Sequence, residues 1–184
     1  MILTEKFPTA VRVNGEVYDV NADFRVGLKI MEAFESPKLA RHEKQYVMIA
    51  LLFPKRPPDF FAASAAAIKF LDCGRQKTNS STGRVFSFTK DADFIYSAFL
   101  QTYGVDLQTA SLHWWAFTRM FADLSPDTTF ERIVSLRVKQ QRGLLSKEEQ
   151  RVWMEAHEVL ELEQEHPDAE LLAAREHFDR LLGG

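Results

Sequence analysis

The side chains that could do chemistry in this sequence are few and scattered. Glu163 and His166 form a Glu-x-x-His pair, whereas a di-iron helical bundle needs two such pairs and two further glutamates. The alternative, which the sequence favours, is a solvated helix end before Pro167. A single cysteine, Cys73, leaves no cysteine-based zinc site and no internal disulfide. We therefore expect no metal and no cofactor.

His113 stands beside Trp114 and Trp115, where a catalytic histidine could be imagined. No serine, cysteine or carboxylate stands at a suggestive spacing, although catalytic partners can be distant in sequence. The alternative is a packed or interfacial histidine at the start of a helix. The sequence also has no Gly-rich phosphate loop and no Gly-x-Ser-x-Gly motif. We therefore expect a protein that is not an enzyme.

Three aspartates could be read as a carboxylate site. Asp91 and Asp93 are two residues apart on a predicted helix, so their side chains point in different directions, and Asp106 lies beyond that helix. In the simpler interpretation, Asp91 caps the N-terminus of the helix and interacts with the helix dipole.

Charge is distributed unevenly along the chain. The net charge is -3, whereas a protein that follows nucleic-acid phosphates usually has a basic surplus. From Lys147 onward there are four basic and eleven acidic residues, which gives a net charge of -7. Residues 1–146 contain 19 basic and 15 acidic residues, which gives a net charge of +4. The acidic end is either a soluble face or a docking segment for a basic or helical partner.

A polar loop at residues 74–84 carries three basic side chains without interleaved aromatics: Arg75, Lys77 and Arg84. We expect a solvated loop there rather than a nucleic-acid site. No signal peptide is predicted at the N-terminus. The longest apolar run, residues 46–53, is far shorter than the roughly 20 residues that a membrane span needs.

An N-terminal hairpin is the clearest predicted element. Asn14-Gly15 lies between alternating residues, and a two-residue type I′ turn needs positive φ at both positions. This pairing puts four side chains on one face: Val11, Val13, Tyr18 and Val20. Because a lone hairpin is marginal in water, this face should pack on helices.

The remaining pattern predicts a mainly α fold, a compact bundle of about seven to eight helices. A helical core domain with the hairpin should cover residues 1–145, and an acidic helical extension residues 146–184. A short strand is predicted at residues 84–88. Helices are expected at 23–35, 42–53, from 59 to about 73, at 91–103, from 109 or 111 to about 124, from 126 to about 141, at 147–166 and at 168–182.

An aromatic stripe on the fifth predicted helix is the most pointed feature. Trp114, Phe117, Phe121 and Leu124 recur at helical spacing and line one face. The stripe is either part of the core or a partly exposed apolar groove, since Trp and Met are enriched where proteins bind one another. If it is a groove, the protein-binding residues are Trp114, Trp115, Phe117, Met120 and Phe121.

Four blocks of the sequence resemble a family of small proteins from phages and prophages of Gram-positive bacteria, named after the fifteenth gene product of one such phage. The blocks are Thr9 to Tyr18 with Asn21 to Arg25, Leu52 to Pro54 with Pro57, Ser87 to Tyr96 with Ala98-Phe99 and Tyr103 to Leu107, and Leu112 to Phe117 with Leu124 to Thr128 and Phe130. Two departures stand out. Gly27 replaces an expected aromatic, and nothing after about Ser146 matches the pattern.

The resemblance implies that this protein is encoded between the genes for the major tail protein and the tape-measure protein. It implies a tail assembly chaperone without catalytic residues or cofactors, which binds the tape-measure protein and helps to recruit tail tube subunits such as the major tail protein. We expect a homo-oligomer in the host bacterial cytoplasm, with no membrane and no nucleic-acid partner. The alternative is a structural virion component, such as a tail connector or completion protein.

Overall fold

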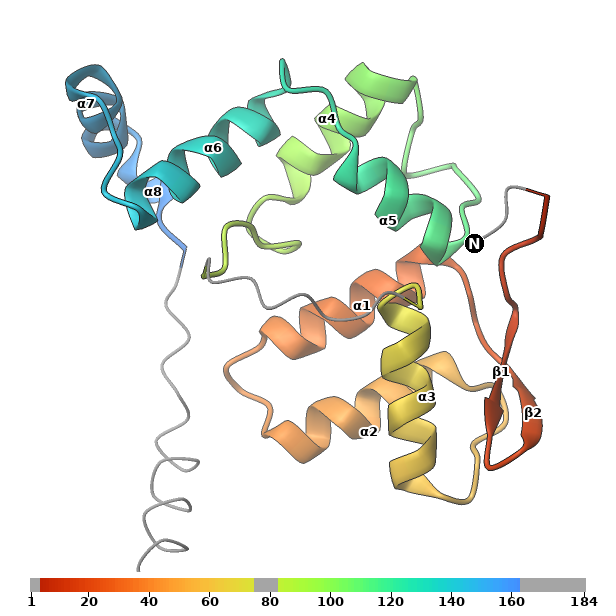
Figure 1. Ribbon diagram of the computed structural model, residues 1–184. Coiled ribbons are helices and arrows are strands. Elements are labelled where there is room, and N and C mark those ends of the chain that lie inside the picture. Colours follow the sequence, from red (N-terminus) through yellow and green to blue (C-terminus); the bar gives the residue numbers. More distant parts are fainter. Residues whose placement is uncertain (1–3, 75–82, 163–184) are drawn as a thin grey trace, which may run out of the picture.

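The structure is a computed structural model that describes residues 4–74 and 83–162 (Figure 1). These residues form a two-stranded hairpin and eight helices, so the mainly α fold with an N-terminal hairpin is confirmed. The elements are β1 (Ala10–Val13), β2 (Glu16–Asp19), α1 (Phe24–Glu35), α2 (Arg41–Leu52), α3 (Phe60–Leu71), α4 (Ala92–Tyr103), α5 (Trp114–Ala122), α6 (Thr129–Gln141), α7 (Lys147–Glu155) and α8 (His157–Leu160).

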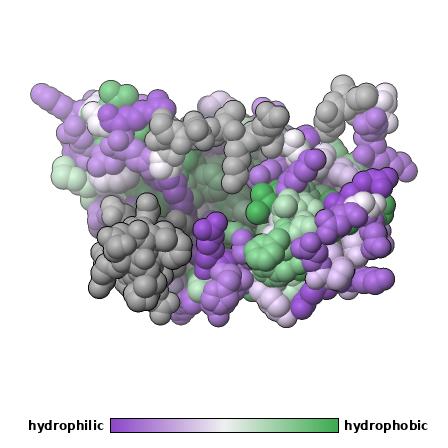
Figure 2. Space-filling model, turned by 60° about the horizontal axis from the view of Figure 1, so that its bottom comes forward, coloured by the Kyte–Doolittle hydropathy of each residue, from purple (hydrophilic) through white to green (hydrophobic). Residues whose placement is uncertain are grey.

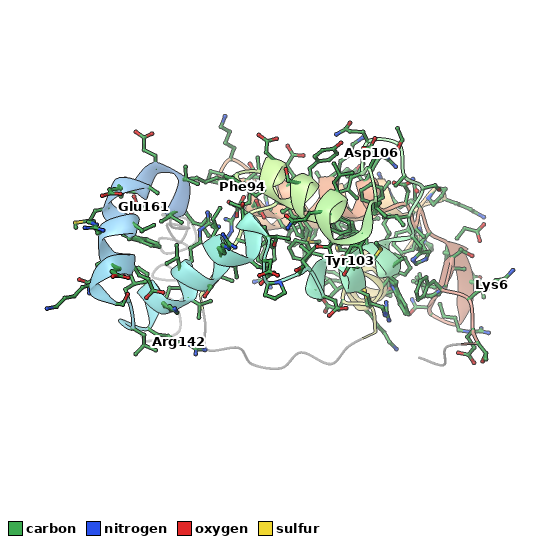
Figure 3. The ribbon with its side chains drawn as sticks, turned by 90° about the horizontal axis from the view of Figure 1, so that it is seen from above. Lys6, Phe94, Tyr103, Asp106, Arg142 and Glu161 are labelled. Atoms are coloured by element: carbon green, nitrogen blue, oxygen red, sulfur yellow. The ribbon has the colours of Figure 1, made fainter. Side chains whose placement is uncertain are left out.

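The helices form two layers on either side of α1. The hairpin, α2 and α3 lie on one side of α1, and α4, α5 and α6 lie on the other (Figure 1). Seen from above, α6 leads away to α7 and α8, at the end of the molecule opposite the hairpin (Figure 3). Arg142 and Glu161 mark that outer end, and Lys6 marks the hairpin end.

The hairpin forms around the predicted two-residue turn. Asn14 and Gly15 have φ angles of 50° and 88°, and the strands pair antiparallel with Val13 opposite Glu16. Val13 and Val20 are buried, as the predicted face requires. The Asn14 side chain also donates a hydrogen bond of 2.9 Å to Asp59, which caps the start of α3. The turn therefore fixes the hairpin against α3.

The starts of α1 and α5 lie side by side. Phe24 N donates to Leu112 O at 3.0 Å, and Trp114 N donates to Ala22 O at 2.7 Å. A Cβ added at Gly27 would lie 2.1 Å from Cε3 of Trp114. The indole ring thus occupies the space that a side chain at position 27 would need, which explains why glycine replaces the expected aromatic.

The ring of Phe117 is fully buried and lies at the centre of the core. Phe24, Phe99, Trp114 and Phe121 stack on it, with ring centroids 5.0–6.0 Å away. These rings come from α1, α4 and α5, so they join α1 to the layer that contains α4 and α5. Stacked and tilted aromatic pairs add to the stabilisation that burial of their area provides.

A buried ion pair attaches the outer end. Arg137 of α6 donates to both carboxylate oxygens of Asp91, at 2.6 and 2.9 Å, and both side chains are at most 2% exposed. The same guanidinium donates to the carbonyls of Val85, Val159 and Leu160. Asp91 stands at the N-cap position of α4, as predicted, but its carboxylate binds Arg137 and Ser87 N instead of capping the helix.

One predicted strand and the boundaries of three predicted helices were wrong. Residues 84–88 form no strand but an irregular segment that side chains hold in place. The fifth helix begins at Trp114, and the sixth begins at Thr129 after the N-cap Thr128. The predicted seventh helix keeps its Ser146 capping box but is interrupted at Ala156, where α8 takes over. The predicted helix at 168–182 and the Glu163–His166 pair lie outside the described residues.

Candidate functional site

The predicted aromatic stripe contributes mainly to the core. Trp114 and Phe117 are buried, and Trp115, Met120 and Phe121 are half-buried. The structure brings all five together on α5 but does not present them as an open surface. Their direct role in protein binding stays a prediction.

The two tryptophans also complete the end of α3. The Trp114 indole N–H donates to Leu71 O at 2.9 Å, and the Trp115 indole N–H donates to Phe70 O at 2.8 Å. The last carbonyls of a helix have no partner within the helix, so outside donors satisfy them. Both indoles therefore join α5 to α3.

His113 has a structural environment. Its Nδ1 accepts a hydrogen bond of 2.9 Å from Trp115 N at the start of α5, and its Nε2 lies 3.0 Å from Pro8 O. Because Nδ1 accepts, Nε2 carries the proton and donates to Pro8. The ring packs against Phe7, Phe70 and Trp115. Both ring nitrogens form hydrogen bonds with backbone atoms.

The candidate site is a groove of about 740 Å³ between the end of α1, the start of α2 and residues 83–88. Its apolar floor consists of Met31, Phe34, Val85, Phe86 and Phe88, and its rim carries Arg41, Lys44 and Arg84. Figure 2 shows a hollow with hydrophobic residues in its depth and hydrophilic residues along its edge. This groove can bind a row of apolar side chains from another protein segment.

The α5 stripe supports the floor of the groove from behind. The Phe121 ring lies 5.0 Å from Phe86 and 5.2 Å from Phe88, centroid to centroid. Phe121 also packs on Phe117 and Phe130. The predicted aromatic residues therefore position the groove without lining it.

Glu35 fixes the irregular segment that forms one wall. Its carboxylate accepts hydrogen bonds from Ser87 Oγ at 2.6 Å and from Phe88 N at 3.0 Å. It also pairs with Arg84 at 2.8 Å. Arg84 therefore pairs with Glu35 beside the groove and does not lie in a solvated loop. Arg75 and Lys77, the other two basic residues of the predicted loop, lie outside the described residues.

The rim is positively charged overall. Lys44 Nζ donates to Phe34 O at 2.9 Å, which keeps its charge at the edge of the groove. Among residues 4–74 and 83–162, no acidic side chain pairs with Lys44 or Arg41. An occupant with acidic side chains beside an apolar face would match both charge and hydropathy.

Sequence reasoning missed the groove residues because they lie on separate segments. Met31 and Phe34 follow each other at helical spacing on α1, and Phe86 and Phe88 flank Ser87. Each pair is a visible local signal of an apolar face. Only the fold brings the two pairs to one hollow.

A second apolar surface lies on α3. Phe61, Ala65 and Ile68 recur on one face, and Phe61 is 83% exposed. A single helix presents this surface, and its residues are not among those that line the groove. It provides a matched comparison for any binding test.

Within the part of the chain that the structure describes, no group of three or more His, Cys, Asp or Glu side chains could hold a metal ion. The described helices also include none with the length and apolarity that crossing a membrane requires.

A family model described as "Bacteriophage Gp15 protein" matches residues 3–162, which include the hairpin, the aromatic core and the groove. The chain belongs to this family. The resemblance that the four sequence blocks indicated is therefore confirmed, and the chain is a bacteriophage protein. Comparisons with curated proteins and with solved structures gave no match. The segment from residue 163 onward lies outside the family match.

Proposed function

We propose that this phage protein is a tail assembly chaperone that binds apolar helical segments of the tape-measure protein and helps to recruit tail tube subunits. The observation that carries the proposal is the groove with its aromatic floor and basic rim, within the region that the family model matches. A helix with one apolar face, laid into such a groove, buries surface that would otherwise promote aggregation.

The proposal places the protein in the host bacterial cytoplasm, before the tail tube covers the tape-measure protein. Binding and release are its whole task, so the proposed role needs no catalytic residue. We further propose that it acts as a homo-oligomer, because several copies would be needed along a long partner.

Co-expression with the tape-measure protein encoded beside it tests the function. We expect the tape-measure protein to become soluble and to co-purify. Met31→Glu should reduce the captured amount at least about tenfold, because the new carboxylate must be desolvated against an apolar partner. Phe61→Glu is the matched control, since it adds the same charge at an exposed apolar position away from the groove.

Two outcomes would overturn parts of this proposal. Loss of capture by Phe61→Glu but not by Met31→Glu moves the binding surface to α3. An insoluble tape-measure protein, together with a fixed copy number of this protein in purified particles by mass spectrometry, identifies a structural virion component instead. Circular dichroism of each variant establishes that the fold is retained.

A further inference from the structure

The groove has a matching occupant within the same chain. We propose that the acidic C-terminal segment, residues 163–184, docks its apolar side chains into the groove and sets its carboxylates against the basic rim. This docking is a property of the isolated chain. Only its consequence, competition with a partner helix for the groove, rests on the proposed function.

Charge complementarity is the first argument. Residues 163–184 contain six acidic and two basic side chains, net -4. The groove lining contains three basic residues and one acidic residue, and Glu35 already neutralises Arg84. Arg41 and Lys44 therefore remain as the charges that face an occupant, and they attract a segment of the opposite sign.

Hydropathy spacing is the second argument. Leu171, Ala174, Phe178 and Leu182 recur at intervals of three, four and four residues, which places them on one face of the helix predicted at 168–182. Such a helix would be about 22 Å long. The floor of the groove offers methionine and phenylalanine side chains, which adapt well to an apolar helix face.

The exit point of the described chain is the third argument. Leu162 lines a smaller cavity of about 450 Å³ together with Glu35 and Arg84, which also line the groove. Lys90 Nζ donates to the carbonyl of Glu161 and so fixes the end of α8 at this place. The following segment therefore starts beside the groove. A short connection gives an effective concentration in the millimolar range, which favours the chain's own segment over that of a second copy.

Photo-cross-linking of the full chain tests the docking. Phe178→p-benzoylphenylalanine places the probe at the centre of the predicted apolar face. After irradiation, peptide mass spectrometry should locate the cross-link at Met31, Phe34 or residues 83–88, within a product of monomer mass. Its yield should not depend on protein concentration, because the contact is intramolecular.

Charge variants sharpen the test. Arg41→Glu with Lys44→Glu should lower the cross-link yield roughly fivefold, the size expected for two partly exposed charge contacts. Lys55→Glu with Lys69→Glu is the matched control, since it makes the same charge change at residues outside the groove lining. Adding Glu170→Arg and Glu176→Arg to the groove variant should restore the yield. This restoration excludes simple misfolding as the cause of the loss.

Several results would overturn the proposal. These are cross-links that map mainly outside the groove, a dimeric product that grows with concentration, or equal yields for the groove and control variants. The tape-measure protein is absent from this experiment. Its outcome is therefore independent of whether the proposed chaperone function is correct.

Discussion

The centre of the molecule and its outer end are held together by different interactions. Around Phe117, aromatic rings from three helices stack on one another, and two indole N–H groups bind α3 carbonyls. At the outer end, one guanidinium carries most of the polar contacts to Asp91, Val159 and Leu160. The centre therefore depends on side-chain shape and volume, whereas the outer end depends mainly on the buried guanidinium of Arg137.

This difference predicts distinct responses to substitution. A packed aromatic centre should tolerate salt and pH changes but not changes in side-chain size. An end attached by a buried ion pair should be sensitive to the loss of either partner, because the other charge stays buried without compensation. Three variants separate the two cases.

Arg137→Met should have the largest effect. It leaves the buried Asp91 carboxylate without its cation, so we expect the free energy of unfolding to fall by about 3–5 kcal/mol. Urea unfolding measures the loss, and hydrogen exchange should show α8 opening before the residues around Phe117. The control is Arg132→Met at an exposed position of the same helix, where the change should stay within about 0.5 kcal/mol. Equal losses in both variants would contradict the role of the ion pair.

Gly27→Ala tests the shape dependence of the centre. Helix propensity alone favours alanine by about 1 kcal/mol. The added Cβ, however, would lie 2.1 Å from the Trp114 ring, so we expect a net loss of about 1–3 kcal/mol in thermal or urea unfolding.

The double variant with Trp114→Phe provides the control for Gly27→Ala. A smaller ring leaves room for the methyl group, so the two changes together should cost less than the sum of the single changes. Strict additivity would show that the close contact between Gly27 and Trp114 does not set the cost.

The smallest effect concerns acid sensitivity at the outer end. A hydrogen bond from Lys139, and then one from Ser146 N, lower the pKa of Glu149 below its usual value of 4.5. The interaction therefore stabilises the fold above that pH and is lost as pH falls through the lower, folded-state value.

Glu149→Gln should make the free energy of unfolding less dependent on pH in this acid range. Urea unfolding at neutral pH and at about pH 3.5 measures the difference from the unchanged chain. Glu148→Gln is the control, because it removes a neighbouring exposed carboxylate of the same helix that does not pair with Lys139. An unchanged slope in Glu149→Gln would argue against the pairing with Lys139.

Local signals were sufficient to predict much of the fold. Asn14-Gly15 specified the hairpin, and Gly104 ends α4 with a φ of 65° at the predicted stop. The start of α5 was misjudged because its N-cap is His113, a residue type that is not among the usual caps. Residues 84–88 alternate like a strand, but no strand among the described residues lies beside them, and Ser87 and Phe88 bind Glu35 instead.

The groove and the ion pair could not be predicted because both depend on distant residues. Asp91 and Arg137 are 46 residues apart, and Glu35 and Ser87 are 52 apart. Neither separation follows from a periodic pattern. The aromatic stripe was visible in the sequence, but its position behind the groove follows only from the rings of Phe86 and Phe88.

The three tryptophans lie in both regions of the molecule, so they can serve as intrinsic fluorescence probes of each region. Trp114 and Trp115 donate their indole N–H groups within the centre, whereas Trp153 is half-buried on α7, a helix without any buried residue. Buried Trp114 should emit at shorter wavelength than half-buried Trp153, and a water-soluble quencher should reach Trp153 before it reaches Trp114. The emission spectrum of the unmodified protein can therefore follow release of the outer end separately from melting of the centre.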